Sequence, residues 1–562
     1  MAGCFLRLFP LLLAAALTAC GQGGSSSAGG DSPARAFMAG HPRVTAATTQ
    51  AADDDRFLHV ITADRAETLD PHNTESGGDT KVIVQIYETL LRVDPENVDN
   101  LVPVLAQSWE VSAEGMTITF QMREGVTFHD GAKLDALAAK NSLDRLQGRY
   151  QDVPAAPYRS YFKFIEAIEA DGMTLTVRLN RPVARVALRN LASFPASIVS
   201  PALLAATQGM DAGQRSTFIS EWASGTGPFY LQQFDSADTL VRLGANEDYW
   251  AGAPAVKRAV FRQVTDPNSQ LEYLRSGQAD ILDDVPRSVW QELETYPNIH
   301  LHRFWALNVC YLGVNVKHQA TRDMRVRQAM RLAIDREGLL ELYYGTARAT
   351  YSIVAQPFAE YDPDYRPPGT EAPLAERLER ARALVREAGA QGRAMSIYYP
   401  LNPRPYLPTP DKVADKIRQQ LETVGLSVKI VGVPNKELFE SVRHDRYELI
   451  LIGWMTDNAD PDNFYTPLTD GDGETGIPSP NNPGRTFDPE IHELIVQAQS
   501  MTDVQERVAA YRAIERIQQE TQVGYVPLVN TQQGYAFGGR IEGVEVDPLG
   551  LYRLYKVTWR GE

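Results

Sequence analysis

The chain has 562 residues, several times the usual domain length of about 100–200 residues, so it holds more than one domain. Hydrophobic residues make up 43% and charged residues 22%, an ordinary globular composition that excludes wholesale disorder. The formal net charge is −16 and no run of five basic residues occurs, which argues against a protein that wraps nucleic acid.

The cysteines are few and lie mostly at the start of the chain. They are Cys4, Cys20 and Cys310, and no CxxC pair exists, which excludes zinc ribbons and thioredoxin-like redox motifs. Arg7 is the one charged side chain of the first twenty residues, and the apolar stretch 9–17 is too short to span a bilayer. This pattern is typical of an export signal.

The apolar stretch ends in Leu-Thr-Ala-Cys at 17–20, which resembles the lipobox of bacterial lipoproteins. In that class the chain is cut before the cysteine, whose thiol then carries a lipid. We predict a signal peptide over 1–19 and lipid attachment at Cys20; an ordinary signal peptide with a chance cysteine is the alternative. Residues 20–55 are rich in Gly, Ser, Ala and Thr without periodicity, which predicts a flexible tether.

Up to about residue 300, the pattern indicates strands, helices and long loops in mixture. Apolar residues at helical spacing predict a helix over 81–91. Alternation of apolar and polar residues predicts strands, which lie at 57–61, 117–122, 175–179 and 229–232.

From about residue 308, strands and helices alternate, which predicts an α/β lobe with a largely parallel sheet. The continuous apolar run 449–452 is typical of a strand covered on both faces. Alternation predicts a last strand over 552–557. The other predicted strands are 396–399 and 426–430, and the predicted helices are 374–388, 413–424, 491–498 and 508–517.

A search for catalytic motifs finds no GxSxG, HExxH or Walker A sequence. The GxGxxG at 471–476 is followed by two prolines within four residues, so we predict a loop there. His300 and His302 share one strand face, either as half a metal site or, the interpretation we favour, as surface residues. We predict no enzymatic activity, no bound metal and no cofactor.

Asp457, Asp460 and Asp462 superficially resemble a calcium-binding loop. The stretch lacks the glycine at position six and the glutamate at position twelve of such a loop, so we do not predict calcium there.

Eight ordered motifs carry a resemblance to one known family. In chain order they are ETLDPHNT (67–74), YETLL (87–91), LVPVLAQSWEVSAEG (101–115), TITFQMREGVTFHDG (117–131), GTGPF (225–229), YLGVNVKHQATRDMRVRQAMRLAIDREGL (311–339), GWMTDNADPDNF (453–464) and VDPLG (546–550). Together they resemble the family 5 extracellular solute-binding proteins, the peptide- and nickel-binding group that serves ABC importers. The resemblance covers about residues 56–560. RPY at 404–406 makes the dipeptide-binding and antimicrobial-peptide-uptake branch the most similar.

The resemblance implies an α/β fold of two lobes joined by a hinge, the large type II periplasmic-binding-protein fold. It implies a first lobe over 56–305 plus 530–562, with an extra subdomain over about 82–180, and a second lobe over 306–529. The pattern changes place the two hinge crossings near 303–309 and 525–532.

The resemblance also implies how a zwitterionic peptide is held. Asp457 matches the position that takes the ammonium group, and Arg404 the position that takes the carboxylate, which the planar guanidinium suits. Asp457 follows a buried strand, where open α/β sheets place ligands. The alternatives are a turn residue for Asp457 and an exposed loop residue for Arg404. The other candidate ligand-binding residues are Trp454, Tyr406, Asn458, Ser76 and Gly77, for which core packing or an ordinary turn is the alternative.

The sequence thus predicts a monomeric substrate-binding lipoprotein that captures short peptides, dipeptides first, and delivers them to the permease and ATPase subunits of an ABC importer. Its place would be the periplasm or the cell surface, with membrane contact through the N-terminal lipid and no nucleic-acid partner. A carrier of haem, a metal chelate or an antimicrobial peptide, or an envelope hydrolase, is the alternative. The relatives carry a disulfide in the region that matches residues 471–485, which have no cysteine here, so the resemblance does not determine the pocket shape near this region or the preferred ligand.

Overall fold

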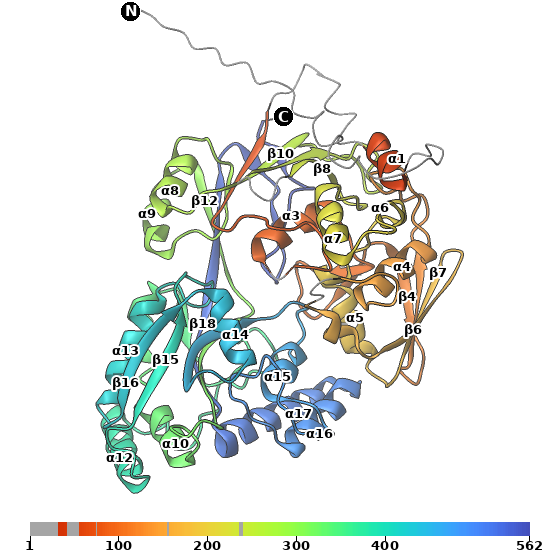
Figure 1. The fold of residues 1–562 in the computed structure, drawn as a ribbon. Coiled ribbons are helices and arrows are strands. Elements are labelled where there is room, and N and C mark those ends of the chain that lie inside the picture. The colour runs from red at the N-terminus through yellow and green to blue at the C-terminus, as the bar shows by residue number, and fades with distance from the viewer. Residues whose placement is uncertain (1–31, 42–55, 75, 154–156, 235–239, 562) are drawn as a thin grey trace, which may run out of the picture.

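The computed structural model describes residues 32–41, 56–74, 76–153, 157–234 and 240–561 (Figure 1). The predicted signal peptide, the lipid attachment at Cys20 and most of the predicted tether lie outside these residues. Within the described part of the chain, no helix is both long enough and apolar enough to cross a membrane.

One 12-stranded sheet runs through the molecule, in the order β16-β15-β17-β13-β18-β11-β1-β10-β9-β8, with β12 and β14 also paired to β18. We call the half with β1 and β8–β12 the first lobe, and the half with β13–β17 the second lobe. The first-lobe strands are β1 (Leu58–Thr62), β8 (Phe229–Phe234), β9 (Leu240–Ala245), β10 (Arg258–Gln263), β11 (Ile281–Leu282) and β12 (Ile299–Trp305). The second-lobe strands are β13 (Asn308–Val314), β14 (Ala347–Ala349), β15 (Ala394–Pro400), β16 (Ser427–Val433) and β17 (Leu449–Met455).

The strand β18 (Tyr525–Gly538) belongs to both lobes (Figure 1). Its first half pairs with β13 and β14, and its second half pairs with β11 and β12. The chain also passes between the lobes at 306–307, where the Ala306 N–H donates to the Thr531 carbonyl at 3.1 Å. The Asn308 side chain holds the same point, because its Nδ2 donates to Thr531 Oγ1 at 3.0 Å. Two adjacent crossings therefore connect the lobes.

The second lobe packs its helices around one large core. Leu449–Ile452 lies at the start of β17 and is fully buried, as its apolar run predicts. Within the second lobe, the strands are parallel only among β15, β16 and β17, whereas β13 runs antiparallel to β17 and to β18, so the largely parallel arrangement is confirmed in part. The predicted helices are confirmed as α12 (Leu374–Glu387), α13 (Pro410–Glu422), α16 (Pro489–Ser500) and α17 (Val504–Ile517), joined by α10 (Met324–Ala333), α14 (Asn435–Arg443) and α15 (Asp462–Thr469).

A separate antiparallel sheet of four strands, in the order β4-β5-β7-β6, forms a subdomain at the far side of the first lobe (Figure 1). Its core draws on residues from Leu90 to Ile198, and α3 (Gly77–Ile86) packs instead into the first-lobe core. The extent of the subdomain as a unit, 82–180, stays a prediction. Its elements are β4 (Ala106–Val111), β5 (Thr117–Met122), β6 (Ile165–Asp171), β7 (Thr174–Leu179), α4 (Ala136–Leu146) and α5 (Ala184–Leu191).

A buried ion pair attaches the subdomain to the first lobe. Arg145 on α4 donates to both oxygens of Asp70, at 2.8 and 2.6 Å, and both side chains are fully buried. Arg145 also donates to His72 Nδ1 at 2.8 Å. Burial, and then the charge of Arg145, lower the pKa of His72 to about 3, which keeps its ring neutral and able to accept. Asp70 and His72 belong to the motif at 67–74, so these residues of the motif stabilise the attachment of the subdomain to the first lobe.

Two predicted elements differ from the structure. The helix predicted over 81–91 starts at Gly77 and ends at Ile86, because the Gly227 N–H takes the Ile86 carbonyl at 2.9 Å. A Cβ atom on Gly225 would lie 2.3 Å from that carbonyl oxygen, so glycines are required for this close approach. The strand predicted over 552–557 is wrong, since the two-residue strands β21 (Tyr552–Arg553) and β22 (Thr558–Trp559) flank a turn there.

Part of the predicted tether is ordered. Residues Pro33–Gly40 form α1, with Ser32 as the N-cap and a proline at the first position. Phe37 contacts Phe218 of α7 (Ala212–Glu221) at 6.2 Å between ring centroids. The prediction of a flexible segment over all of 20–55 is therefore wrong for this stretch, because Phe37 contacts Phe218 and the buried His41 ring lies against Trp222.

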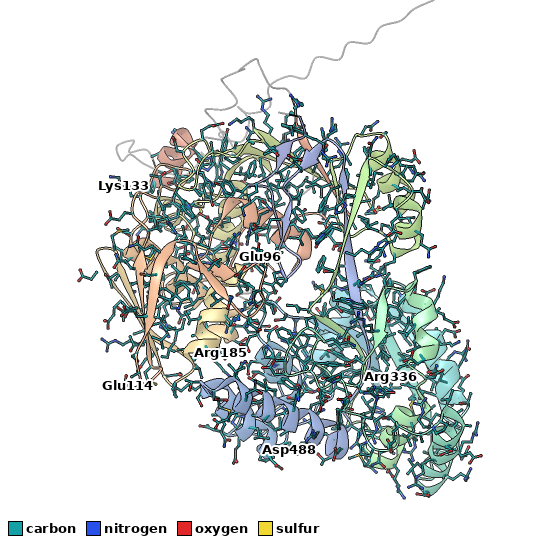
Figure 2. The ribbon with its side chains drawn as sticks, turned by 180° about the vertical axis from the view of Figure 1, so that it is seen from behind. Glu96, Glu114, Lys133, Arg185, Arg336 and Asp488 are labelled. Carbon is teal, nitrogen blue, oxygen red and sulfur yellow. The ribbon has the colours of Figure 1, made fainter. Side chains whose placement is uncertain are left out.

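Charged side chains project from the outer surface, as Glu114 and Lys133 do in Figure 2. Arg336 is an exception, buried in the second lobe, where its Nε donates to the carbonyls of Thr350 and Pro527 at 3.0 and 2.7 Å. Cys310 on β13 is a buried free thiol, and burial raises its pKa to about 12. This thiol is therefore inert at neutral pH.

We expect the lobes to close on a ligand by a rigid-body rotation about 306–307 and the middle of β18, because these are the connections in the sheet between them. Small-angle scattering with a saturating peptide should give a smaller radius of gyration than scattering without it. Identical curves for a peptide that binds by calorimetry would contradict this.

Candidate ligand-binding site

The strand directions bring four strand ends toward each other. β18 leads from the second lobe to the first; β17 and β15 run parallel to it, while β1 and β11 run against it. The carboxyl ends of both sets therefore point into the space between the lobes, where open α/β sheets bind ligands. The charged residues that follow these four ends are Asp64, Asp284, Arg404 and Asp457.

Asp457 lies just beyond the end of β17, as predicted, and is half-buried. Its Oδ2 accepts a hydrogen bond from Tyr161 of the subdomain at 3.2 Å, and its N–H donates to Asn463 Oδ1 at 3.2 Å. Burial raises the pKa of Asp457 to about 7. Among the residues that the structure describes, no Lys, Arg or His lies within ion-pair distance of it. Asp457 is thus a carboxylate in need of a cation.

Arg404 lies in the loop after β15 and, in contrast to Asp457, is a cation without an anionic partner among the residues described. Its backbone pairs with Leu407, with N···O distances of 3.0 and 2.8 Å. Its Nε is buried without an acceptor, and no carboxylate of the described chain lies within ion-pair distance of the guanidinium. The neighbouring Tyr406, and less strongly Asp64 and Asp284, hold the pKa of Arg404 above its usual value. Arg404 is therefore a cation without an anionic partner in the described chain.

Tyr406 and Trp454 connect the two loops. Tyr406 is buried against Gly453, where a Cβ atom would lie 2.4 Å from the ring, so glycine is required beside it. Trp454 is half-buried, and its Nε1 donates to Asn463 Oδ1 at 3.2 Å, the same oxygen that accepts from Asp457. Both aromatic residues thus help to position the charged ones, and their contact with a ligand stays a prediction.

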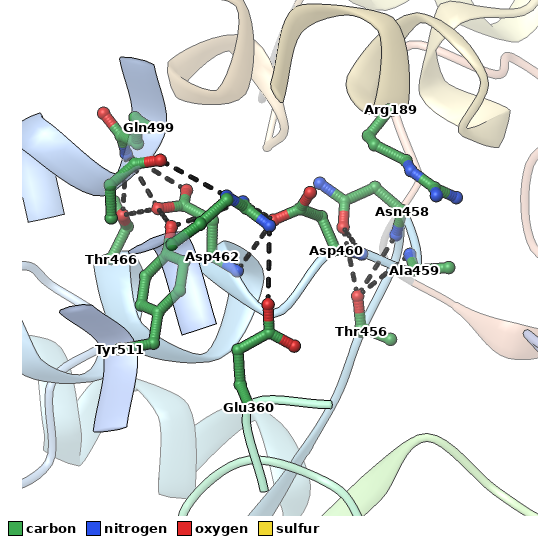
Figure 3. A network of polar contacts seen from close by, with 12 residues as sticks. Arg189, Glu360, Thr456, Asn458, Ala459, Asp460, Asp462, Thr466, Gln499 and Tyr511 are labelled. Carbon is green, nitrogen blue, oxygen red and sulfur yellow. Dashed lines mark hydrogen bonds and ion pairs between the residues drawn. The ribbon is translucent and has the colours of Figure 1, made fainter. Parts of the chain in front are cut away.

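Asn458 is placed in a network that occupies its side chain (Figure 3). Its Nδ2 donates to Asn190 Oδ1 of α5 at 2.5 Å, and its Oδ1 accepts from Thr456 Oγ1 and from the Asp460 N–H. The side chain joins the subdomain to the second lobe, like the Tyr161–Asp457 contact. Its role in ligand binding stays a prediction.

The carboxylates that resemble a calcium loop are engaged by protein groups (Figure 3). Asp460 is paired with Arg507 at 2.5 Å, and both side chains are buried. Asp462 accepts from Tyr511 at 2.8 Å and from Gln499 at 2.9 Å. In the part of the chain described here, no cluster of His, Cys, Asp and Glu has the arrangement of a metal site.

In the first lobe, Ser76 caps α3 by accepting from the Gly78 N–H at 3.2 Å. Gly77 is open, since a Cβ atom there would meet nothing within 4 Å. A Cβ atom on Gly78 would lie 2.5 Å from the Arg65 carbonyl oxygen, so the required glycine is the next residue along. Asp79 secures this loop by accepting from the Glu67 N–H at 2.5 Å.

Sequence reasoning missed the first-lobe charges near Arg404. Lys81 on α3 lies 2.7 Å from Asp283 and 3.0 Å from Asp284. The signal was present, because this pair of aspartates directly follows an apolar strand. The contacts of Tyr161 and Asn190 with the second lobe carried no such signal, since they join segments almost 300 residues apart.

A pocket of about 570 Å³ lies elsewhere, between the subdomain and α15–α16. Lys163 and Arg181 line one side, and Asp470 and His492, 2.8 Å apart, line the other. The GxGxxG at 471–476 forms a loop at this pocket, as predicted, and none of the predicted ligand residues lies there. His300 and His302 share one face of β12, as predicted, and both rings stack on Phe537.

Comparisons with known proteins agree with this architecture. Residues 100–476 match the model of the bacterial extracellular solute-binding proteins, family 5 Middle, and the chain belongs to this family. The peptide transport periplasmic protein SapA of Salmonella typhimurium is 29% identical in an alignment 535 positions long, which covers 90% of this chain and 94% of that protein. The di/tripeptide-binding protein 4 of Pseudomonas aeruginosa is 29% identical, with 97% of both chains covered.

A solved structure of the dipeptide binding protein from Pseudoalteromonas sp. SM9913 in complex with Met-Leu is similar in fold. The TM-score is 0.80 at 25% identity, and the match covers 90% of this chain and all of that one. The predicted fold class, a two-lobed type II periplasmic-binding-protein fold, is thereby confirmed.

The state of Asp457 has a consequence for stability without ligand. Its pKa is about 7 in the folded protein against 3.8 ordinarily, so the folded state holds an extra proton between these values and loses stability as pH rises through 7. Asp457→Asn should therefore stabilise the ligand-free protein by about 1–3 kcal/mol at pH 8 and hardly at pH 4, measured by urea unfolding.

The matched control is Asp460→Asn. Arg507 holds the pKa of Asp460 below its usual value despite burial, so this substitution should destabilise the protein at pH 8. A loss of stability at pH 8 in Asp457→Asn as well would contradict the assigned state.

Proposed function

We propose that this protein is the substrate-binding lipoprotein of an ABC importer, and that it captures short peptides, dipeptides first, between its lobes. The observation that carries the proposal is the pair of uncompensated charges in the second lobe. In the described part of the chain, Asp457 is a carboxyl group without a cationic partner, whose pKa burial raises, and Arg404 is a cation without an anionic partner, in loops that follow the neighbouring strands β17 and β15. A free peptide presents the complementary charges, an ammonium group at one end and a carboxylate at the other.

The names of the relatives support the same ligand class. SapA is described as a peptide transport protein, the Pseudomonas protein as a di/tripeptide-binding protein, and the similar solved structure holds Met-Leu. The lipid anchor at Cys20, the periplasmic or cell-surface location and the delivery to a permease are parts of this proposal. They rest on the sequence pattern of residues 1–20 and on the family.

The placement of both anchors in one lobe bears on ligand length. Their separation does not depend on how far the lobes close. An extended dipeptide spans roughly 6–7 Å between its charged ends, and each charged contact adds about 2.8 Å. We therefore propose a distance of roughly 10–13 Å between the Asp457 carboxylate and the Arg404 guanidinium.

We expect Asp457→Ala to lower the affinity for Met-Leu by about 10²–10³, because losing one member of a buried charge pair costs about 3–5 kcal/mol. The measurement is isothermal titration calorimetry, with Glu474→Ala, an exposed neighbour, as the control variant. N-acetyl-Met-Leu, which has no ammonium group, should bind the native protein and Asp457→Ala equally weakly. A loss below about tenfold for free Met-Leu would reject the ammonium anchor.

A length series tests capture by both ends. Each added residue lengthens an extended peptide by about 3.5 Å, which the fixed anchors cannot follow, so Met-Leu-Leu should bind at least about tenfold more weakly than Met-Leu. Amidation of the Met-Leu carboxylate should lower the affinity of the native protein by a similar factor and leave the affinity of Arg404→Ala unchanged. Equal affinities for the dipeptide and the tripeptide would show that only the amine end is held.

A further inference from the structure

We propose that the carboxylate end of this site selects peptides whose C-terminal side chain is cationic, with Asp64 and Asp284 of the first lobe as the groups that recognise it. The inference rests on the proposed function, since it assumes that Arg404 takes the peptide carboxylate. It adds a substrate class, dipeptides that end in lysine or arginine.

The first step is the position of the two aspartates. β1 and β11 are parallel neighbours, with Val60 opposite Ile281 and Ile61 opposite Leu282. Asp64 and Asp284 come two residues after the ends of these strands, so they lie at the same edge of the first lobe. Both are close enough to Arg404 for their charges to act on it.

The second step is a contact that joins this edge to the loop of Arg404. Arg287 donates through Nη2 to the carbonyl of Pro405 at 2.5 Å and to the carbonyl of Gln532 at 2.6 Å. Thr531 Oγ1 donates to the same Pro405 carbonyl at 2.9 Å. Thr531 lies at the crossing between the lobes, so this contact is close to the axis about which they would move. The carboxyl end of a peptide on Arg404 would therefore lie next to Asp284.

The third step is the local balance of charge. The Lys81 ammonium group forms ion pairs with both Asp283 and Asp284, at 2.7 and 3.0 Å. Asp283 is fully buried and its Oδ1 has no hydrogen-bond partner, so one ammonium group does not satisfy the pair. Asp64 has no cation within ion-pair distance among the residues described.

The net charge of these groups determines which side-chain charge the site favours in a ligand. Three carboxylates (Asp64, Asp283, Asp284) face three cations (Lys81, Arg287, Arg404), so the site without ligand is balanced. A peptide carboxylate on Arg404 leaves one negative charge unmatched at an edge where Asp283 is fully buried, Asp284 half-buried and Asp64 exposed, and an unmatched charge is costly where it is buried. A lysine or arginine side chain on the same peptide residue restores the balance, and a glutamate makes it worse.

The experiment is calorimetry at pH 8 with three dipeptides that share their N-terminal residue: Ala-Lys, Ala-Met and Ala-Glu. Burial raises the pKa of Asp283, so a pH above neutral is used to favour its charged form. The native protein should bind Ala-Lys about tenfold more tightly than Ala-Met, and Ala-Met about tenfold more tightly than Ala-Glu. Methionine is the uncharged match for the length of lysine.

Asp64→Asn should reduce the preference for Ala-Lys to less than about threefold and leave the affinity for Ala-Met almost unchanged. Asp64 is the better position for substitution because it has no ion-pair partner whose loss would disturb folding. Asp284→Asn is the second variant and should act in the same direction. Glu114→Gln, which removes one negative charge from the outer surface of the subdomain, should keep the full preference (Figure 2).

The outcomes separate the two proposals. If Ala-Met binds but Ala-Lys and Ala-Glu bind with the same affinity as Ala-Met, the selection for a cation is overturned and the peptide-binding function stands. A preference for Ala-Lys that survives in the Asp64→Asn/Asp284→Asn double variant also overturns the assignment of these residues. If no dipeptide binds the native protein, the proposed function fails and this inference fails with it.

Discussion

The pairing of one strand with both lobes is the constraint on which the rest of the structure depends. The first half of β18 pairs with strands of the second lobe and its second half with strands of the first lobe, so the two lobes share one sheet. This arrangement sets the directions of β1, β11, β15 and β17, and with them the edges at which loops carry charged groups. It also puts the Thr531–Pro405 contact at the crossing, so the loop of Arg404 is held by the connection about which the lobes would move.

The charged residues described above divide into those that form an ion pair and those that do not. Asp70 with Arg145, and Asp460 with Arg507, are buried pairs that hold parts of the chain together. Asp457 and Arg404 lack such partners and lie at strand ends. Buried charges are normally compensated, so an uncompensated pair of opposite sign indicates that a ligand completes it. This contrast, rather than the presence of acidic residues as such, is what separates Asp457 from Asp460 and Asp462.

The part of the fold that sequence reasoning recovered is the part with strong periodicity. The helices over 374–388 and 413–424 and the buried strand at 449–452 are stabilised by their own apolar faces, so their pattern is visible without the partner. The helix predicted over 81–91 ends at Ile86 instead, because a distant Gly227 takes its carbonyl. The ordered α1 was missed because contacts with residues far along the chain stabilise it, Phe37 with Phe218 and His41 with Trp222, and the local sequence does not reveal them.

By itself, the sequence determined the family, the alternation of strands and helices, and the placement of Asp457 after a buried strand, because local spacing and ordered motifs carry this information. Only the tertiary structure decided which charges are compensated, since an ion pair such as Asp460–Arg507 joins residues that are far apart in the chain. It also decided that Gly78 rather than Gly77 is the required glycine, that Lys81 pairs with Asp283 and Asp284, and that the charge of Asp284 acts on Arg404. These facts depend on contacts between residues far apart in the chain, and such contacts cannot be inferred from a single sequence.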